Sequence, residues 1–286
     1  MGSHNFVSTE WLAGRLNAPE LGVIDASWHL PTAGRNGAEE FRQGHIPGAV
    51  FFDIDTIADL SSGLPHMLPD EAAFAAAMGK LGLDENMTLV VYDSLGLFAA
   101  ARVWWTLRAF GAGKVKILEG GLPKWIREGR PLEQGDAARP PRTFHARLDP
   151  RAVASRADVG RALAGGAVQV VDARSADRFE GRAPEPRPGV KSGHMPGAFN
   201  LPFVEIVDAG KLKSPPALAE TFAAHGLDLK RPMITTCGSG VTAAILALAA
   251  EEAGGKVVGL YDGSWAEWGS RDDCPIETGP GRVAAP

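Results

Sequence analysis

The sequence predicts an α/β fold of two tandem domains, each a parallel sheet flanked by helices. Short apolar strands alternate with helical segments along the chain, which is typical of βα units around a sheet buried on both faces. The same succession of motifs occurs twice, which indicates two copies of one domain. The chain has 286 residues, of which 45% are hydrophobic and 22% charged, and this suffices for two ordinary globular domains.

The repeat is visible in motifs that lie a nearly constant distance apart. An early apolar strand in each half ends near an acid, Asp25 in the first copy and Asp172 in the second. Each strand is followed by a Gly-His-x-Pro-Gly-Ala segment, which contains His45 in the first copy and His194 in the second. The offset is 147 residues for the acids and 149 for the histidines. We expect both histidines to be structural, since each lies in a turn before Pro-Gly.

Other apolar runs predict the remaining main strands and helices. The expected strands include residues 88–92, 168–172, 232–236 and 257–260. The expected helices include residues 71–81, 98–110, 216–224 and 243–252. Trp104 and Trp105 lie in an apolar helical stripe, so we expect both in the core.

The loop between the expected strand 232–236 and the expected helix 243–252 reads Cys237-Gly238-Ser239-Gly240-Val241-Thr242. Free backbone N–H groups and the positive end of the helix dipole converge at such a helix start, and glycines let the backbone curl around an anion. This setting stabilises a thiolate, which is the nucleophilic form of cysteine. Cys237 is therefore the candidate nucleophile, and the alternative is a buried cysteine that only packs in the core.

The two copies differ at the position of this cysteine. Asp93 stands in the first copy where Cys237 stands in the second, so the first copy lacks thiol chemistry there. The stretch after residue 129 is rich in Pro, Gly and charge, which is typical of a linker. We therefore expect a non-catalytic N-terminal domain over 5–130, a linker over 131–150 and a catalytic C-terminal domain over 151–286.

Charge and cysteine content exclude several classes of function. The net charge is −5 and the pI about 5.8, so we expect no binding to nucleic acid, and nothing in the sequence requires a membrane. Two cysteines are too few for a disulfide scaffold and fit a reducing compartment. No secretory signal is expected at the first residues, and the default location is the cytoplasm. The seven histidines lack metal-ligand spacing and no P-loop is present, so neither a metal nor another cofactor is expected.

These features together resemble the two-domain rhodaneses over nearly the whole chain. Within that family, the Cys237 loop is similar to that of 3-mercaptopyruvate sulfurtransferases, whereas thiosulfate sulfurtransferases carry two cations where this chain has Gly238 and Ser239. Matching segments begin at Asp25, Phe51, His66 and Pro184. The resemblance implies transfer of sulfur from 3-mercaptopyruvate, through a Cys237 persulfide, to a small thiol, thioredoxin or cyanide, with release of pyruvate.

The resemblance also implies roles for individual residues. Arg178 and Arg187 resemble the pair that holds the substrate carboxylate and keto oxygen, a task that suits the planar guanidinium fork. Asp55, His66 and Ser239 resemble a relay that polarises the donor and handles protons. The remaining loop residues are expected to bind the substrate: Gly238, Gly240, Val241 and Thr242. Without the resemblance, His66 fits a turn residue and Asp55 fits a cap for the segment that follows.

Other functions stay open at this point. A thiosulfate:cyanide sulfurtransferase differs in its donor, and a non-catalytic persulfide carrier would bind a partner without releasing pyruvate. A cysteine phosphatase is disfavoured, because Ala243 stands where its loop would carry an arginine. We expect no catalytic role for Cys274, while a redox partnership with Cys237 stays open. The physiological acceptor, the pathway and the oligomeric state are not determined by the sequence.

Overall fold

The computed structural model describes residues 4–282, which form two compact units. The first unit comprises the described residues up to Asp59, together with Leu68–Asp149 and Ala209–Lys211. The second unit comprises Leu60–Met67, Pro150–Asp208 and the described residues from Leu212 onward. Residues 1–3, where no secretory signal is expected, and residues 283–286, at the end of the predicted second domain, lie outside the described part.

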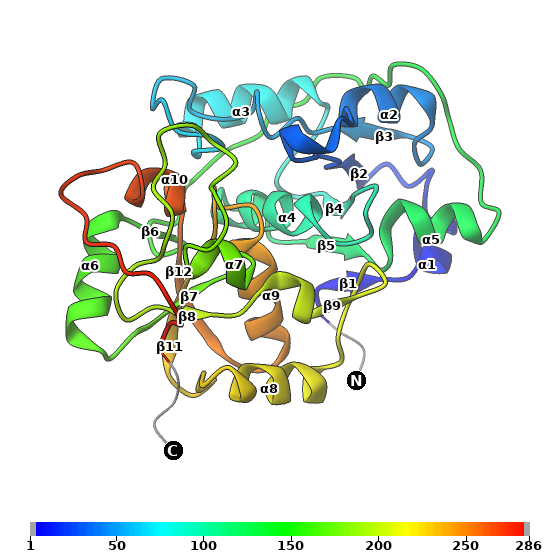
Figure 1. Cartoon of the computed structure of the whole chain (residues 1–286). Helices are drawn as coiled ribbons and strands as arrows, with labels where there is room; N and C mark the ends of the chain where they lie inside the picture. Colours follow the sequence, from blue (N-terminus) through cyan, green and yellow to red (C-terminus); the bar gives the residue numbers. More distant parts are fainter. Residues whose placement is uncertain (1–3, 283–286) are drawn as a thin grey trace. The chain divides into compact units, whose positions relative to one another are not determined.

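A five-stranded parallel sheet forms the centre of the first unit, with the strand order β1-β5-β4-β2-β3. Helices flank this sheet (Figure 1). The strands are β1 (Phe6–Val7), β2 (Leu21–Asp25), β3 (Ala49–Phe51), β4 (Thr88–Tyr92) and β5 (Val115–Leu118). The helices are α1 (Thr9–Ala13), α2 (Gly37–Gln43), α3 (Glu71–Lys80), α4 (Ala99–Ala109) and α5 (Gly121–Arg127), with a short 3-10 helix η1 (Pro31–Ala33).

The second unit repeats this architecture with the parallel strand order β6-β12-β11-β7-β8. Its strands are β6 (Val153–Ala154), β7 (Gln169–Asp172), β8 (Phe199–Asn200), β11 (Pro232–Thr236) and β12 (Lys256–Tyr261). Its helices are α6 (Arg156–Gly165), α7 (Ala176–Phe179), α8 (Pro215–Ala224), α9 (Ala243–Glu252) and α10 (Ser264–Trp268), with a 3-10 helix η2 (Phe203–Glu205). The chain also contains a two-stranded sheet of β9 (Val207–Asp208) and β10 (Lys211–Leu212). The prediction of two tandem α/β domains with parallel sheets is confirmed.

The strands that position the candidate loop have the ranges that the sequence predicts. The strands β4 and β11 occupy the predicted ranges, because both are short apolar runs that a central parallel strand buries on two faces. Helix α9 also matches its prediction, and its first eight residues are all buried. A helix that is apolar on all sides must lie inside the domain, which explains why no polar face interrupts its sequence.

Helix α4 begins at Ala99, one residue later than predicted. Phe98 has φ −143° and ψ −89°, which is not helical. Its N–H donates instead to the Asp93 carboxylate at 2.7 Å. Trp104 and Trp105 of this helix are 2% and 8% exposed, so their predicted place in the core is confirmed.

The segment predicted as a linker is largely packed on the first unit, which includes its residues up to Asp149. Phe144 is buried there and packs edge-on against Phe74. Arg142 donates to Asp84 at 2.7 Å. An isolated Phe and a few charges leave no periodic signal, so composition alone predicts a linker here.

The two Gly-His histidines occupy equivalent places in the two units. His45 stacks on Phe41 with ring centroids 3.9 Å apart, and its Nδ1 lies 2.8 Å from the Phe41 carbonyl oxygen. His194 stacks on Phe179 at the same centroid distance of 3.9 Å, and its Nδ1 lies 3.0 Å from the Phe179 carbonyl oxygen. Burial lowers the pKa of His194. These contacts fit the structural role predicted for both side chains.

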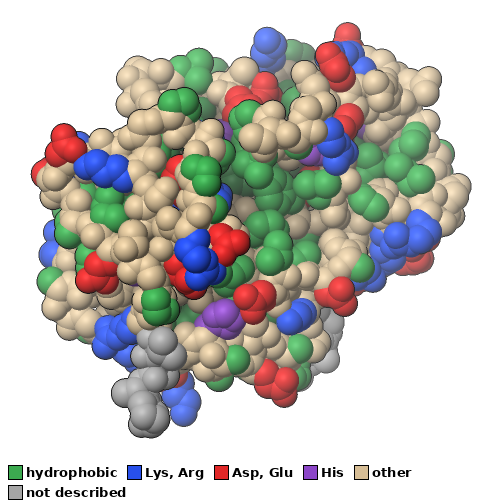
Figure 2. Space-filling view, in the orientation of Figure 1, with side chains coloured by type: hydrophobic (Ala, Val, Ile, Leu, Met, Phe, Trp, Pro, Cys, Tyr) green, Lys and Arg blue, Asp and Glu red, His purple; other side chains and the backbone are tan. Residues whose placement is uncertain are grey.

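Lys and Arg side chains are interspersed with Asp and Glu on the face shown in Figure 2. Across residues 4–282, no helix combines the length and apolar character needed to cross a membrane. Within the same residues, no group of three or more His, Cys, Asp or Glu side chains is placed to hold a metal ion.

Candidate active site

Cys237 lies at the carboxyl end of β11, where the chain turns into helix α9. Its side chain is buried. Gly240 has φ +79°, a conformation that glycine adopts at no steric cost, and it turns the loop toward the helix. Thr242 precedes the helix without a side-chain capping hydrogen bond, and the N–H groups of Ala244 and Ile245 donate to the carbonyl oxygens of Val241 and Thr242 at 3.3 and 3.1 Å. The positive end of the helix dipole favours an anion beside the sulfur.

Ser264 fixes the backbone at the cysteine, and sequence reasoning did not single it out. Its hydroxyl donates to the Tyr261 carbonyl oxygen at 2.7 Å and accepts the Cys237 N–H at 3.2 Å. Ser264 has φ +49°, which is unfavourable for a residue with a Cβ. The equivalent residue in the first copy is Gly121, with φ +53°. The repeat aligns a serine with a glycine at this position, but the positive φ that the two residues share is visible only in the folded backbone.

The first unit carries a carboxylate where the second carries the thiol. The Asp93 carboxylate accepts N–H groups from Leu95 at 2.9 Å, Phe98 at 2.7 Å and Ala100 at 2.9 Å. These hydrogen bonds lower the pKa of the Asp93 carboxyl, but burial has the larger effect and raises it. The strand-to-helix loop of this fold therefore accommodates an acidic group among its backbone N–H groups.

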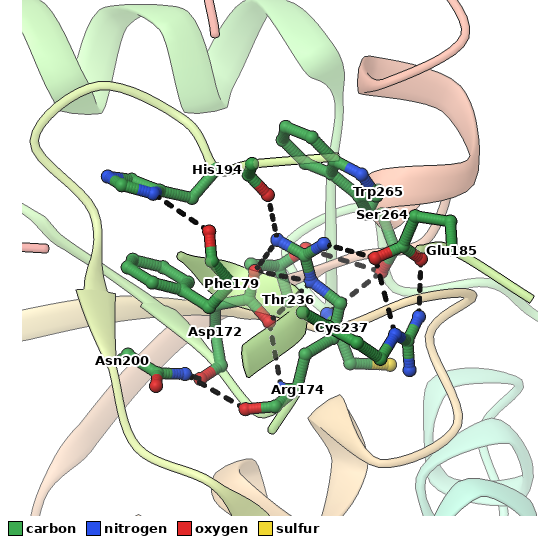
Figure 3. A network of polar contacts seen from close by, with 12 residues as sticks. Asp172, Arg174, Phe179, Glu185, His194, Asn200, Thr236, Cys237, Ser264 and Trp265 are labelled. Atoms are coloured by element: carbon green, nitrogen blue, oxygen red, sulfur yellow. Dashed lines mark hydrogen bonds and ion pairs between the residues drawn. The ribbon is translucent and has the colours of Figure 1, made fainter. Parts of the chain in front are cut away.

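A network of buried charges lies beside the cysteine loop (Figure 3). Arg174 pairs with Asp172, its Nε at 3.0 Å and its Nη2 at 2.8 Å from Asp172 Oδ2. Its third nitrogen, Nη1, donates to Glu185 at 2.8 Å, and its guanidinium lies 4.3 Å from the centroid of the Trp265 ring. Glu185 also accepts from Arg178, through both carboxylate oxygens. Sequence reasoning missed Glu185, because the Pro-rich segment around it has no periodicity that indicates a buried carboxylate.

Gly238 allows Arg178 to approach the loop. A Cβ on residue 238 would lie 3.0 Å from Nη2 of Arg178. The φ of Gly238 is not positive, so backbone conformation does not require glycine at this position. The requirement is for space beside the guanidinium. The absence of a side chain at 238 thus brings a cation next to the sulfur-bearing turn.

His66 and Ser239 meet within the second unit. Nδ1 of His66 lies 3.0 Å from Oγ of Ser239, and both residues are buried. His66 has φ +62°, a conformation that is uncommon for residues other than glycine and that concentrates at functional sites. The contact joins two of the three residues expected to form a relay.

The third relay residue, Asp55, lies in the first unit. Its carboxylate accepts a hydrogen bond from the Trp28 indole N–H at 3.0 Å.

Arg187 lies two residues beyond Glu185 and is partly exposed. In the loop itself, Val241 is buried and Thr242 is partly exposed.

Cys274 packs in the core of the second unit. Its sulfur lies 3.7 Å from Nη1 of Arg156. Both cysteines are free thiols.

The arrangement suits nucleophilic chemistry on a small anion. It combines a sulfur nucleophile in the loop before a helix N-terminus, a guanidinium beside the turn and a hydroxyl–imidazole pair that can pass a proton. The comparisons with known proteins agree with this description. Residues 8–128 and 155–271 each match the family model of the rhodanese-like domain.

Relatives of known identity extend the likeness to almost the whole chain. A 3-mercaptopyruvate sulfurtransferase of Escherichia coli K12 is 46% identical over 273 residues, which cover 95% of this chain and 97% of that protein. The human 3-mercaptopyruvate sulfurtransferase is 43% identical over 286 residues, with coverage of 97% and 96%. A crystal structure of an Escherichia coli 3-mercaptopyruvate sulfotransferase superposes with a TM-score of 0.85 at 45% identity, covering 91% of this chain and 98% of that one.

Proposed function

Since this chain belongs to the family of proteins built from rhodanese-like domains, we propose that it is a 3-mercaptopyruvate sulfurtransferase. It takes the sulfur of 3-mercaptopyruvate onto Cys237 as a persulfide and releases pyruvate. The observation that carries the proposal is the position of Cys237 at the carboxyl end of β11, in the loop that leads into α9, with Arg178 beside the adjoining Gly238. The names of two relatives at 46% and 43% identity support the choice of donor.

Arg178 and Arg187 hold the substrate in this proposal. A guanidinium offers parallel N–H donors that match a carboxylate, and the adjacent keto oxygen accepts further hydrogen bonds. Arg178 is only 23% exposed at its side chain, so an anion bound to it is partly shielded from water. Its place beside Gly238 brings the sulfur of a bound mercaptopyruvate toward Cys237.

The chemical step moves one sulfur atom. The Cys237 thiolate attacks the thiol sulfur of the substrate, a new S–S bond forms and the C–S bond breaks. The electron pair of the broken bond stays on carbon as the enolate of pyruvate, which takes a proton to give pyruvate. The persulfide remains on Cys237, where the loop residues Gly238, Gly240, Val241 and Thr242 surround it and backbone N–H groups stabilise its charge.

The pair of His66 and Ser239 handles protons in this scheme. The hydroxyl of Ser239 is within hydrogen-bond distance of His66 Nδ1, which lets it donate to the substrate while the imidazole takes or returns a proton. We assign Asp55 to the same relay, as the family resemblance implies.

An acceptor then removes the outer sulfur. A thiolate or cyanide attacks the outer sulfur of the persulfide, which restores the Cys237 thiolate and gives a new persulfide or thiocyanate. With the dithiol of reduced thioredoxin, the resulting persulfide resolves to a disulfide and hydrogen sulfide. Both cysteines of this chain are free thiols, and such thiols persist in a reducing compartment, so we propose that the enzyme works in the cytoplasm.

The donor preference tests the proposal. We would compare kcat/KM for 3-mercaptopyruvate and for thiosulfate with one acceptor, in the wild type and in Arg187→Ala. A strong preference for mercaptopyruvate that is lost in the variant is the expected result. A preference for thiosulfate would favour the thiosulfate:cyanide alternative. Absence of turnover with either donor would favour a persulfide carrier and overturn the proposal.

A further inference from the structure

We propose that Glu185 determines the charge of the donor that the site accepts. Its carboxylate offsets the charge of Arg178 and leaves one edge of that guanidinium for the substrate, so that a singly charged donor is favoured over a doubly charged one. The inference rests on the proposed function, because it concerns the donor-binding step of that reaction.

Glu185 is held in place from two sides. Its side chain is only 4% exposed. Oε1 accepts from Arg174 Nη1 at 2.8 Å and from Arg178 Nε at 3.2 Å, while Oε2 accepts from Arg178 Nη2 at 2.5 Å. Arg174 is itself fixed by Asp172, so Glu185 has little freedom to move away when a second anion approaches.

The contacts of Arg178 define which edge it presents. Glu185 occupies the edge formed by Nε and Nη2. Among residues 4–282, no hydrogen-bond partner of Arg178 Nη1 is observed. The edge formed by the two terminal nitrogens is thus the one that faces a ligand, and its direction is set by Glu185.

The buried network carries no net charge. Asp172 and Glu185 contribute two negative charges, and Arg174 and Arg178 contribute two positive charges. The adjoining loop residues Gly238 and Ser239 add no charge. An anion on Arg178 therefore meets an attractive guanidinium and, directly behind it, a repulsive carboxylate that water screens poorly.

Repulsion from a fixed carboxylate grows with the charge of the ligand. Mercaptopyruvate in its thiol form carries one negative charge, and thiosulfate carries two. The dianion is therefore repelled about twice as strongly by Glu185 at the same distance. Removing this one charge favours the dianion relative to the monoanion, whatever it does to overall turnover.

The test compares the wild type with Glu185→Gln, which keeps the shape of the side chain and removes its charge. With cyanide as the acceptor, at one pH and one ionic strength, we expect the ratio of kcat/KM for thiosulfate to that for mercaptopyruvate to rise about tenfold. Glu185→Asp retains the charge, so its ratio should stay near that of the wild type even if both rates fall. If Glu185 had a purely structural role, both variants would lower kcat/KM for both donors by the same factor.

Glu180→Gln is the matched control, since Glu180 pairs with the exposed Arg182 on the same segment. We expect no change of the ratio in this variant. A ratio in Glu185→Gln that stays within about twofold of the wild type would overturn the inference. So would a ratio that rises equally in Glu185→Asp.

A second measurement needs neither turnover nor a variant. Methanesulfonate and sulfate share a tetrahedral shape but carry one and two negative charges. We expect methanesulfonate to protect Cys237 from alkylation by the neutral reagent iodoacetamide at a concentration no higher than that of sulfate. Stronger protection by sulfate would contradict the inference even if the chain releases pyruvate. Absence of pyruvate release would contradict the proposed function and leave the protection assay to decide which anion charge the site favours.

Discussion

Ser239 Oγ lies 3.0 Å from His66 Nδ1, although 173 residues separate them in the chain. His66 comes from Leu60–Met67, a short segment of the first half of the sequence that belongs to the second compact unit. The catalytic loop therefore obtains its imidazole from outside the repeat that contains the cysteine. The local pattern of strand, glycine-rich loop and helix therefore indicates the cysteine but not its imidazole neighbour.

Substitution of either residue of this pair should lower catalysis. We expect Ser239→Ala and His66→Gln each to reduce kcat/KM for mercaptopyruvate on the order of a hundredfold, since each removes one member of a proton path. The double variant should be little worse than either single variant, because the two act as one unit. Steady-state kinetics of the three variants measure kcat/KM. The rate of alkylation of Cys237 shows whether the loop is intact in each variant. If the loss of kcat/KM in the double variant equals the product of the two single losses, the two residues do not act as one unit.

Gly238→Ala should weaken substrate binding. The added Cβ would lie 3.0 Å from Nη2 of Arg178, so the guanidinium must move by a few tenths of an ångström. We expect KM for mercaptopyruvate to rise about three- to tenfold, with a smaller effect on kcat. Gly160→Ala is the control, because a Cβ there meets no atom within 4 Å. A KM unchanged in Gly238→Ala would mean that Arg178 does not bind the donor in its observed position.

Two substitutions at Ser264 separate backbone strain from hydrogen bonding. Both Ser264→Gly and Ser264→Ala remove the acceptor of the Cys237 N–H, but only glycine relieves the strain of φ +49°. We therefore expect the glycine variant to be about 1 kcal/mol more stable than the alanine variant. Both should lose activity, since the backbone at Cys237 is less firmly held. Urea unfolding measures the difference, and an alanine variant that is the more stable of the two would contradict the assignment of strain.

Asp25 makes the stability of the first unit depend on pH. It is equivalent to Asp172, but Ser27 stands where the second copy has the paired Arg174, so no cation offsets its burial. Burial raises the pKa of the Asp25 carboxyl to about 6. The stability associated with its protonated form is present below about pH 4, the ordinary range of an aspartate, and is lost as the pH rises through about 6.

Asp25→Asn should remove this part of the pH dependence. A pKa raised from 3.8 to about 6 corresponds to about 3 kcal/mol, so the stability of the variant relative to the wild type should increase by up to that amount between about pH 4 and pH 7. Urea-unfolding midpoints of both proteins at about pH 4, 5 and 7 test this. Parallel curves for the two proteins would show that Asp25 titrates in the folded chain as it does in the unfolded one.

Local patterns in the sequence were sufficient for the main elements and for Cys237. The strands β4 and β11 and the helix α9 are runs of buried apolar residues, and the turn between β11 and α9 is marked by its glycines. The repeat predicts equivalent positions, which is how Asp93 is recognised as the counterpart of Cys237. Arg178 and Ser239 came from the family resemblance and lie in the unit that contains the cysteine.

Other parts of the site depend on contacts that no local pattern encodes. Glu185 is defined by its position between Arg174 and Arg178, and nothing in the Pro-rich segment indicates that its carboxylate is buried. Ser264 depends on a positive φ that only the folded backbone imposes. The inclusion of Leu60–Met67 in the second unit results from long-range packing.

Sulfur transfer through Cys237 is tested by the mass of the chain after reaction with 3-mercaptopyruvate without an acceptor. We expect a gain of one sulfur atom, located on Cys237 by peptide mapping, together with about one equivalent of pyruvate released in a burst. Addition of a thiol or cyanide should remove the added sulfur, and Cys237→Ser should show neither the mass gain nor the burst. Release of pyruvate without sulfur on Cys237, or a burst that persists in Cys237→Ser, would show that the reaction does not pass through a Cys237 persulfide.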